Sequence, residues 1–162
     1  MTKNLISREM CGKDLKHLTK ADLYSDVVLL VVMLLLFVPL AFLGVYLSKY
    51  ILILGIACTV ICAIAPVTFI VKLINNIKIV RLVSRGGFSV VKDTVSRLSK
   101  GEVVGRNSTA DIIYFAVHGR YIPSQSTFDM TSVGDEFYLV VLHTSKRTPM
   151  FAFHSMIYEY KE

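Results

Sequence analysis

The chain has 162 residues, of which 54% are hydrophobic, and its formal net charge is +6. The hydrophobic fraction is above the usual range for soluble domains, and the length fits one domain. Residues 1 to 85 hold ten Lys or Arg against four Asp or Glu and carry the whole +6, whereas residues 86 to 162 hold eight of each sign. A neutral C-terminal half offers no basic stripe for a phosphate backbone, so nucleic acid is excluded as the expected partner.

Residues 1–26 mix charged side chains with scattered apolar ones, among them Leu15, Leu18 and Leu23. We expect a cytoplasmic N-terminal segment here. Two alternatives remain open for it, a weakly amphipathic segment on the inner membrane surface and a partly ordered tail.

Two apolar stretches follow, residues 27–47 and residues 51–71, each of 21 residues without a charge. About 20 helical residues cross the hydrocarbon core of a bilayer, and only a helix satisfies its own backbone hydrogen bonds there. The sequence therefore predicts two transmembrane helices. The connection, residues 48–50, is so short that the helices must form an antiparallel hairpin.

Small residues recur at spacings of three or four in the second stretch, at Gly55, Thr59 and Cys62. Ala41 and Gly44 are the expected counterparts on the first stretch. Small side chains let helix backbones approach closely in lipid, so these five residues are the candidates for packing between the helices.

Positive charge near the apolar stretches predicts orientation. Nine Lys or Arg stand just before the first stretch or just after the second, against Lys49 alone in the connection. Both termini are therefore expected in the cytoplasm, with residues 48–50 forming an external turn.

Residues 72–87 keep a helical pattern of apolar residues and are expected to extend the second helix beyond the membrane as a basic juxtamembrane segment. Its basic side chains, which anionic headgroups would attract, are Lys72, Lys78, Arg81 and Arg85. Gly86 and Gly87 are expected to end the helix.

The period changes in residues 88–162, where four stretches are rich in β-branched and aromatic residues: 88–98, 111–119, 136–144 and 149–160. Short strands separated by turn-like segments predict a small antiparallel β-sheet or barrel. The connection Ser145-Lys146-Arg147 is short enough for a hairpin between the third and fourth stretches. The expected fold is thus a membrane helical hairpin followed by a small cytoplasmic β domain.

The run VGDEFYLVVL, followed by an apolar strand that ends in IYEY, resembles the C-terminal parts of small bacterial membrane proteins with two helices and a compact β domain. The layout is also similar, more loosely, to NfeD-like proteins, which carry membrane helices before a small β-barrel. This resemblance implies a scaffold or assembly role and a plasma-membrane location.

Catalytic and cofactor signatures are absent from the sequence: it has no GxSxG, no GxxxxGK[ST], no GxGxxG, and no cysteine after Cys62. His118, His143 and His154 could meet in space and, with Asp135, hold a metal, but their spacing favours scattered histidines. No catalytic, cofactor or metal site is expected.

Taken together, these observations predict a non-enzymatic, multi-pass protein of the cell membrane whose β domain binds a protein partner or assembles with copies of itself. One alternative is an accessory subunit of a transporter or membrane enzyme, with the hairpin packed against a larger partner. A metal-dependent enzyme that uses the β-domain histidines is the weaker alternative.

Overall fold

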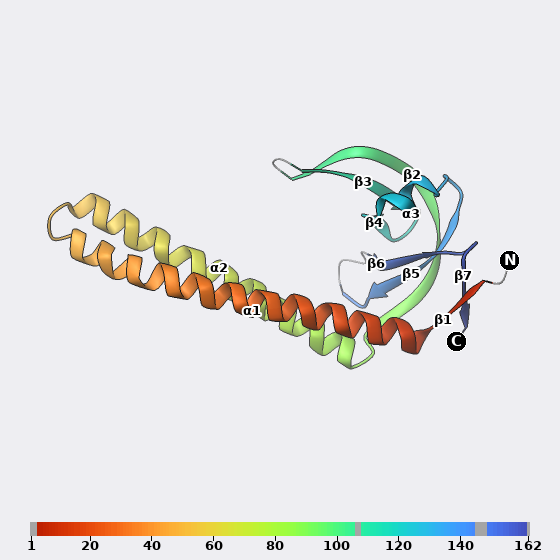
Figure 1. Ribbon diagram of the computed structural model, residues 1–162, viewed down its shortest axis with the longest axis horizontal. Helices are drawn as coiled ribbons and strands as arrows, with labels where there is room; N and C mark the ends of the chain where they lie inside the picture. Colours follow the sequence, from red (N-terminus) through yellow and green to blue (C-terminus); the bar gives the residue numbers. More distant parts are fainter. Residues whose placement is uncertain (1–2, 106–107, 145–148, 162) are drawn as a thin grey trace. The chain divides into compact units, whose positions relative to one another are not determined.

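A computed structural model describes residues 3–105, 108–144 and 149–161 (Figure 1). The chain divides into two compact units. The helical unit comprises residues 16–81, and the β unit combines the residues up to Leu15 with those from Leu82 onward. The two ends of the chain therefore belong to one unit.

Both apolar stretches lie in long helices, α1 (Arg8–Leu47, 40 residues) and α2 (Leu52–Ser84, 33 residues). Within the described residues these two helices are long and apolar enough to cross a membrane. The turn between them is tight, because the backbone N–H groups of Tyr50 and Ile51 both donate to the Leu47 carbonyl at 2.9 Å. The expected antiparallel hairpin is present.

Helix α1 begins well before its apolar stretch, so residues 8–26 are an ordered helix continuous with that stretch, which contradicts the expected alternative of a partly ordered tail. Ser7 stabilises the helix start by accepting a hydrogen bond from the backbone N–H of Met10 at 3.3 Å. Once a helix is nucleated, each added residue forms one further bond, and the apolar stretch thereby extends helix into charged sequence.

The end of α2 matches the expected glycine stop. Gly86 adopts a left-handed conformation with φ of 72°. Its N–H donates to the Val83 carbonyl at 3.0 Å, and the N–H of Gly87 donates to the Leu82 carbonyl at 2.9 Å. This pair of bonds is a Schellman motif, which satisfies carbonyl groups that a helix end otherwise leaves unpaired.

The β unit is built on an antiparallel sheet with the strand order β4-β3-β2-β5-β6. Its strands are β2 (Phe88–Gly105), β3 (Ser108–Phe115), β4 (Gly119–Tyr121), β5 (Glu136–Leu142) and β6 (Pro149–His154). The long strand β2 pairs first with β5 and then with β3, and it is visibly curved (Figure 1). The sheet curls until its edge strands β4 and β6 contact one another, which gives a small, partly open barrel.

The expected hairpin between the third and fourth stretches is confirmed, since β5 and β6 pair in antiparallel fashion. Its connection, residues 145–147, lies outside the described residues.

The core of the barrel is formed by apolar side chains that alternate along the strands. Its fully enclosed members include Ile113, Phe137 and Leu139, each 0% exposed. Phe137 packs edge-on against Phe115, with ring centroids 5.6 Å apart. Phe128, from the short helix α3 (Gln125–Asp129), completes the cluster.

Two strands join the ends of the chain: β1 (Asn4–Ser7) pairs in parallel with β7 (Tyr158–Lys161). The first turns of α1 also belong to the β unit, where Cys11 and Leu15 are buried and Gly12 lies beside Phe88. The Arg8 guanidinium lies over the Phe88 ring, 5.6 Å from its centroid. Neither β1 nor α3 is predicted by the sequence pattern.

Candidate functional site

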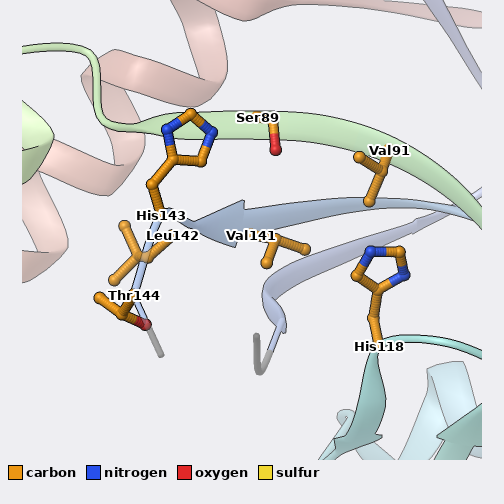
Figure 2. Close-up of a pocket in the computed structure, with 7 residues that line it drawn as sticks. All are labelled: Ser89, Val91, His118, Val141, Leu142, His143 and Thr144. Carbon is orange, nitrogen blue, oxygen red and sulfur yellow. The ribbon is translucent and has the colours of Figure 1, made fainter. Parts of the chain in front are cut away.

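A pocket of about 460 Å³ opens at one end of the barrel, and we call it the mouth pocket (Figure 2). Its seven lining residues come from β2, β5 and the segments that follow β3 and β5: Ser89, Val91, His118, Val141, Leu142, His143 and Thr144. The pocket adjoins the core, because on the paired strands β2 and β5 Ser89 pairs with Val141 and Val91 pairs with Leu139. It is large enough for a small molecule.

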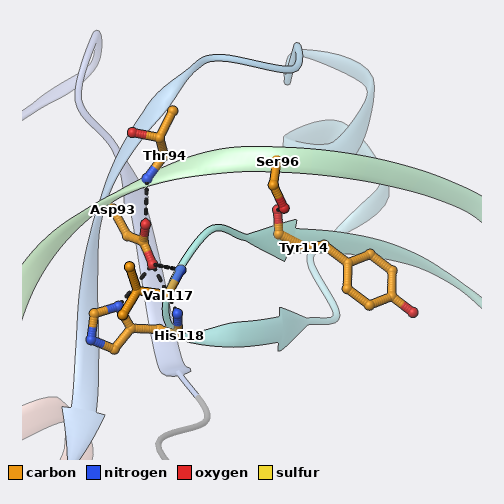
Figure 3. Close-up of polar contacts among 6 residues, drawn as sticks. All are labelled: Asp93, Thr94, Ser96, Tyr114, Val117 and His118. Atoms are coloured by element: carbon orange, nitrogen blue, oxygen red, sulfur yellow. Dashed lines mark hydrogen bonds and ion pairs between the residues drawn. The ribbon is translucent and has the colours of Figure 1, made fainter.

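Asp93 is the charged centre beside this pocket. Its side chain is 4% exposed, and it lies on the same face of β2 as Ser89 and Val91 because alternate residues of a strand share a face. One carboxylate oxygen accepts the backbone N–H of Thr94 at 2.7 Å. The other accepts the backbone N–H groups of Val117 at 3.1 Å and His118 at 2.9 Å (Figure 3).

The same oxygen of Asp93 also lies 2.8 Å from Nδ1 of His118. Burial by itself raises the pKa of Asp93, but the hydrogen bonds from His118, Thr94 and Val117 outweigh it and hold the pKa below its ordinary value. The carboxyl is therefore ionised near neutral pH and can only accept hydrogen bonds.

This arrangement determines the state of the His118 ring. Because the carboxylate only accepts, Nδ1 carries the proton and donates it to Asp93. In the neutral imidazole, Nε2 is then a hydrogen-bond acceptor. Nε2 has no hydrogen-bond partner among the described residues, and Figure 3 shows it on the side of the ring away from Asp93.

A carboxylate-oriented histidine also occurs in catalytic triads, where a hydroxyl nucleophile lies within hydrogen-bond reach of the ring. Ser89 is the serine of the mouth pocket, but Figure 2 shows it apart from His118, which lies nearer to Val91. His143 lines the far end of the pocket, where its backbone N–H donates to the Gly87 carbonyl at 3.0 Å. The geometry therefore suits binding better than acyl transfer.

The three histidines of the β unit do not converge. His154 belongs to a different part of the barrel, where its Nε2 lies 3.1 Å from Asp135 and its Nδ1 accepts the backbone N–H of Met156 at 3.2 Å. Both ring nitrogens of His154 are thus engaged in holding the turn after β6. Within the described residues, no group of three or more potential ligands is close enough to hold a metal ion.

The structure brings three of the five helix-packing candidates together in the helical unit. A Cβ added to Gly44 would lie 2.8 Å from Thr59 Oγ1, and one added to Gly55 would lie 2.4 Å from the backbone nitrogen of Ser48. Side chains larger than hydrogen therefore cannot fit at either glycine without a shift. Cys62 is buried at 7% exposure, and Ala41 is half-buried.

A polar cluster at the start of the apolar stretch was not predicted. The Asp26 side chain is 8% exposed and lies 2.6 Å from Nζ of Lys72 on the other helix. The Asn76 side-chain amide, one turn further along α2, donates to the second carboxylate oxygen. The hydrogen bond from Lys72 lowers the pKa of Asp26, against the effect of burial.

The predicted basic residues of the juxtamembrane segment thus differ in environment. All four, Lys72, Lys78, Arg81 and Arg85, are exposed, but Lys72 is in addition paired across the hairpin with Asp26. Lys72 therefore has a role between helices that the charge count alone does not reveal.

Sequence reasoning also missed Asp93 and His118 as partners. One signal could have identified Asp93, because it occupies an inward position in the alternation of Ser89, Val91, Asp93 and Val95 along β2. A charged residue on the inward face of a strand needs partners. Nothing local indicates that His118, 25 residues away, is one of them.

Comparison with protein-family models, with curated proteins and with solved structures finds no match to this chain.

Proposed function

We propose that this chain is a non-enzymatic, multi-pass protein of the cell membrane, with α1 and α2 as its anchor and the β unit as a cytoplasmic module that binds a protein partner or a second copy. One observation carries the proposal: the apolar stretches of both helices remain largely uncovered. Only 6% of the most apolar part of α1 and 12% of that of α2 is buried. Such surface is unfavourable in water and favourable in lipid.

Two features support placing both termini in the cytoplasm. Nine basic residues flank the ends of the hairpin that lead to the termini, against Lys49 at the turn. In addition, β1 and β7 pair with one another, so the chain before α1 and the chain after α2 belong to one folded unit. A single unit can occupy only one side of a membrane.

A binding role for the β unit is supported by its chemistry. The mouth pocket offers one oriented imidazole beside the apolar side chains of Val91 and Val141. Covalent catalysis needs a nucleophilic side chain within hydrogen-bond reach of the ring, and the described hydrogen-bond partners of the His118 ring include Asp93 but no hydroxyl.

Fractionation and protease protection test the proposal. The full chain should stay in the membrane pellet after alkaline carbonate extraction. Protease added to inside-out vesicles should digest the β unit, whereas sealed right-side-out vesicles should protect it. Release by carbonate would contradict membrane insertion, and protection in the inside-out vesicles would contradict the orientation.

An accessory subunit of a transporter or membrane enzyme is the alternative function. The small residues do not by themselves support it, because Gly55 and Thr59 lie against Gly44 of α1 within the same hairpin. Leucine at these positions would therefore disrupt the hairpin itself and would not report on an external partner.

A further inference from the structure

We propose that the mouth pocket binds a small molecule that combines an apolar body with one hydrogen-bond donor, a hydroxyl or an amine, and that Nε2 of His118 accepts that donor. The inference goes beyond the proposed function, because partner binding and membrane anchoring do not require an occupied pocket.

The hydrogen bonds that Asp93 accepts determine which ring nitrogen of His118 is left as an acceptor for a ligand. Asp93 receives three backbone N–H groups and the Nδ1–H of His118, so its acceptor capacity is used and the ring cannot turn without breaking a 2.8 Å bond. The imidazole is thereby held with its acceptor nitrogen away from the carboxylate.

The His118 side chain is 14% exposed, and its unpartnered Nε2 is not among the fully buried side-chain atoms of the described residues. His118 lines the mouth pocket and Asp93 does not. Any molecule that fills the pocket displaces water from this acceptor. A ligand without a donor would leave the acceptor unpaired, at a cost in affinity, whereas a hydroxyl or amine would replace the lost water.

The rest of the pocket determines the shape of the ligand. Val91 and Val141 supply apolar surface nearest to His118, and Ser89, Leu142 and His143 lie farther away (Figure 2). Its volume of about 460 Å³ suits a ring or a short chain. The described lining residues include no Lys or Arg, and Asp93 adds negative charge behind the ring, so an anionic head group is disfavoured.

Phenol and anisole test the donor requirement directly, because they share an aromatic ring and differ in the hydrogen-bond donor. Binding to the full chain in lipid nanodiscs is followed by the methyl resonances of Val91 and Val141 and by the ring ¹⁵N resonances of His118. Phenol is expected to bind about five- to tenfold more tightly than anisole, the value of one net hydrogen bond. It should also shift the Nε2 resonance, whereas anisole should not.

His118→Phe should reduce the ratio of the phenol affinity to the anisole affinity to about one, because phenylalanine fills the same space without an acceptor. His17→Phe is the matched control and should keep the full preference, since His17 is exposed and belongs to the helical unit. Equal affinities of phenol and anisole for the wild-type chain, or an unmoved Nε2 resonance, would overturn the proposal without any substitution. A preference that survives His118→Phe would overturn it as well.

Discussion

In the helical unit, large apolar side chains such as Leu35 and Ile53 are 70% and 83% exposed, whereas in the β unit Phe137 and Leu139 are 0% exposed. The helical unit has close backbone approach at Gly44 and Gly55 and one polar cluster at Asp26. The β unit has an enclosed apolar core and a buried carboxylate network. The barrel is therefore stabilised by removing apolar surface from water, whereas the proposed membrane location would place the apolar surface of the hairpin in lipid.

The largest effect is expected from Phe137→Ala, which removes a core ring that contacts Phe115 and His154. Loss of such a side chain costs about 3–5 kcal/mol. Hydrogen exchange of the β5 amides should accelerate strongly, while the amides of the apolar stretches should keep their protection. Val117→Ala, at a position that is 70% exposed, is the control. An equal acceleration of hydrogen exchange in both units would contradict the difference between the enclosed core of the β unit and the uncovered helices.

Asp93→Ala should come next, because it leaves the backbone N–H groups of Thr94, Val117 and His118 without their acceptor. The expected loss is about 2–3 kcal/mol of unfolding free energy, from unsatisfied buried donors. Urea unfolding in mild detergent, monitored at the β5 amides, measures it. A loss below that of an ordinary surface substitution would mean that the network does not hold the turn before β4.

The Asp93 carboxylate is also expected to make the unfolding free energy depend on pH. Folding lowers the pKa of Asp93. The contribution of this carboxylate to the unfolding free energy is therefore fully present above its pKa in the unfolded chain, about 4, and is lost as the pH falls through the folded pKa. The difference in unfolding free energy between wild type and Asp93→Asn should therefore stay constant above about pH 5 and shrink below it. A difference that grows on acidification would contradict the ionised state.

A smaller effect is expected in the helical unit from Gly55→Leu, whose Cβ would meet the backbone of Ser48. Overpacking of this kind costs about 1–3 kcal/mol. Unfolding by titration of mild detergent with dodecyl sulfate, followed by far-ultraviolet circular dichroism, reports on the hairpin. Ile53→Leu, at an outward position, should leave the transition unchanged. The β5 amides should be unaffected by either substitution.

The smallest effect is expected at the cross-helix pair, because Lys72 is 59% exposed and solvent weakens its attraction to Asp26. Asp26→Lys and Lys72→Asp should each lower the midpoint of the same titration, since each places like charges together. The double variant should recover most of the loss. Additive losses in the double variant would show that the two side chains act independently.

Much of the fold was predictable because its signals are local. An apolar stretch of 21 residues is sufficient to indicate a long helix, and a pair of glycines is sufficient to indicate its end. The pairing of β5 with β6 follows from a short connection between two β-rich stretches. The small residues Gly44 and Gly55 likewise indicate close helix approach through their spacing alone.

The rest depends on contacts between residues far apart in the sequence. His118 is recognisable as a site residue only once Asp93 is placed beside it, and Lys72 only once Asp26 is. The helix α3 has five residues, too few for a helical period to show. A pattern in a single sequence reports on residues that are close together along the chain, so it could not predict these features.

The parallel pairing of Asn4 with Tyr158 also has a consequence for biosynthesis. The first strand leaves the ribosome early, but its partner is made only after both long helices and the whole barrel sequence. Until then β1 has no ladder, and α1 starts from an unanchored end. The order of translation therefore makes both long helices available before the β unit can close, so the proposed insertion of the hairpin can come before β1 and β7 pair.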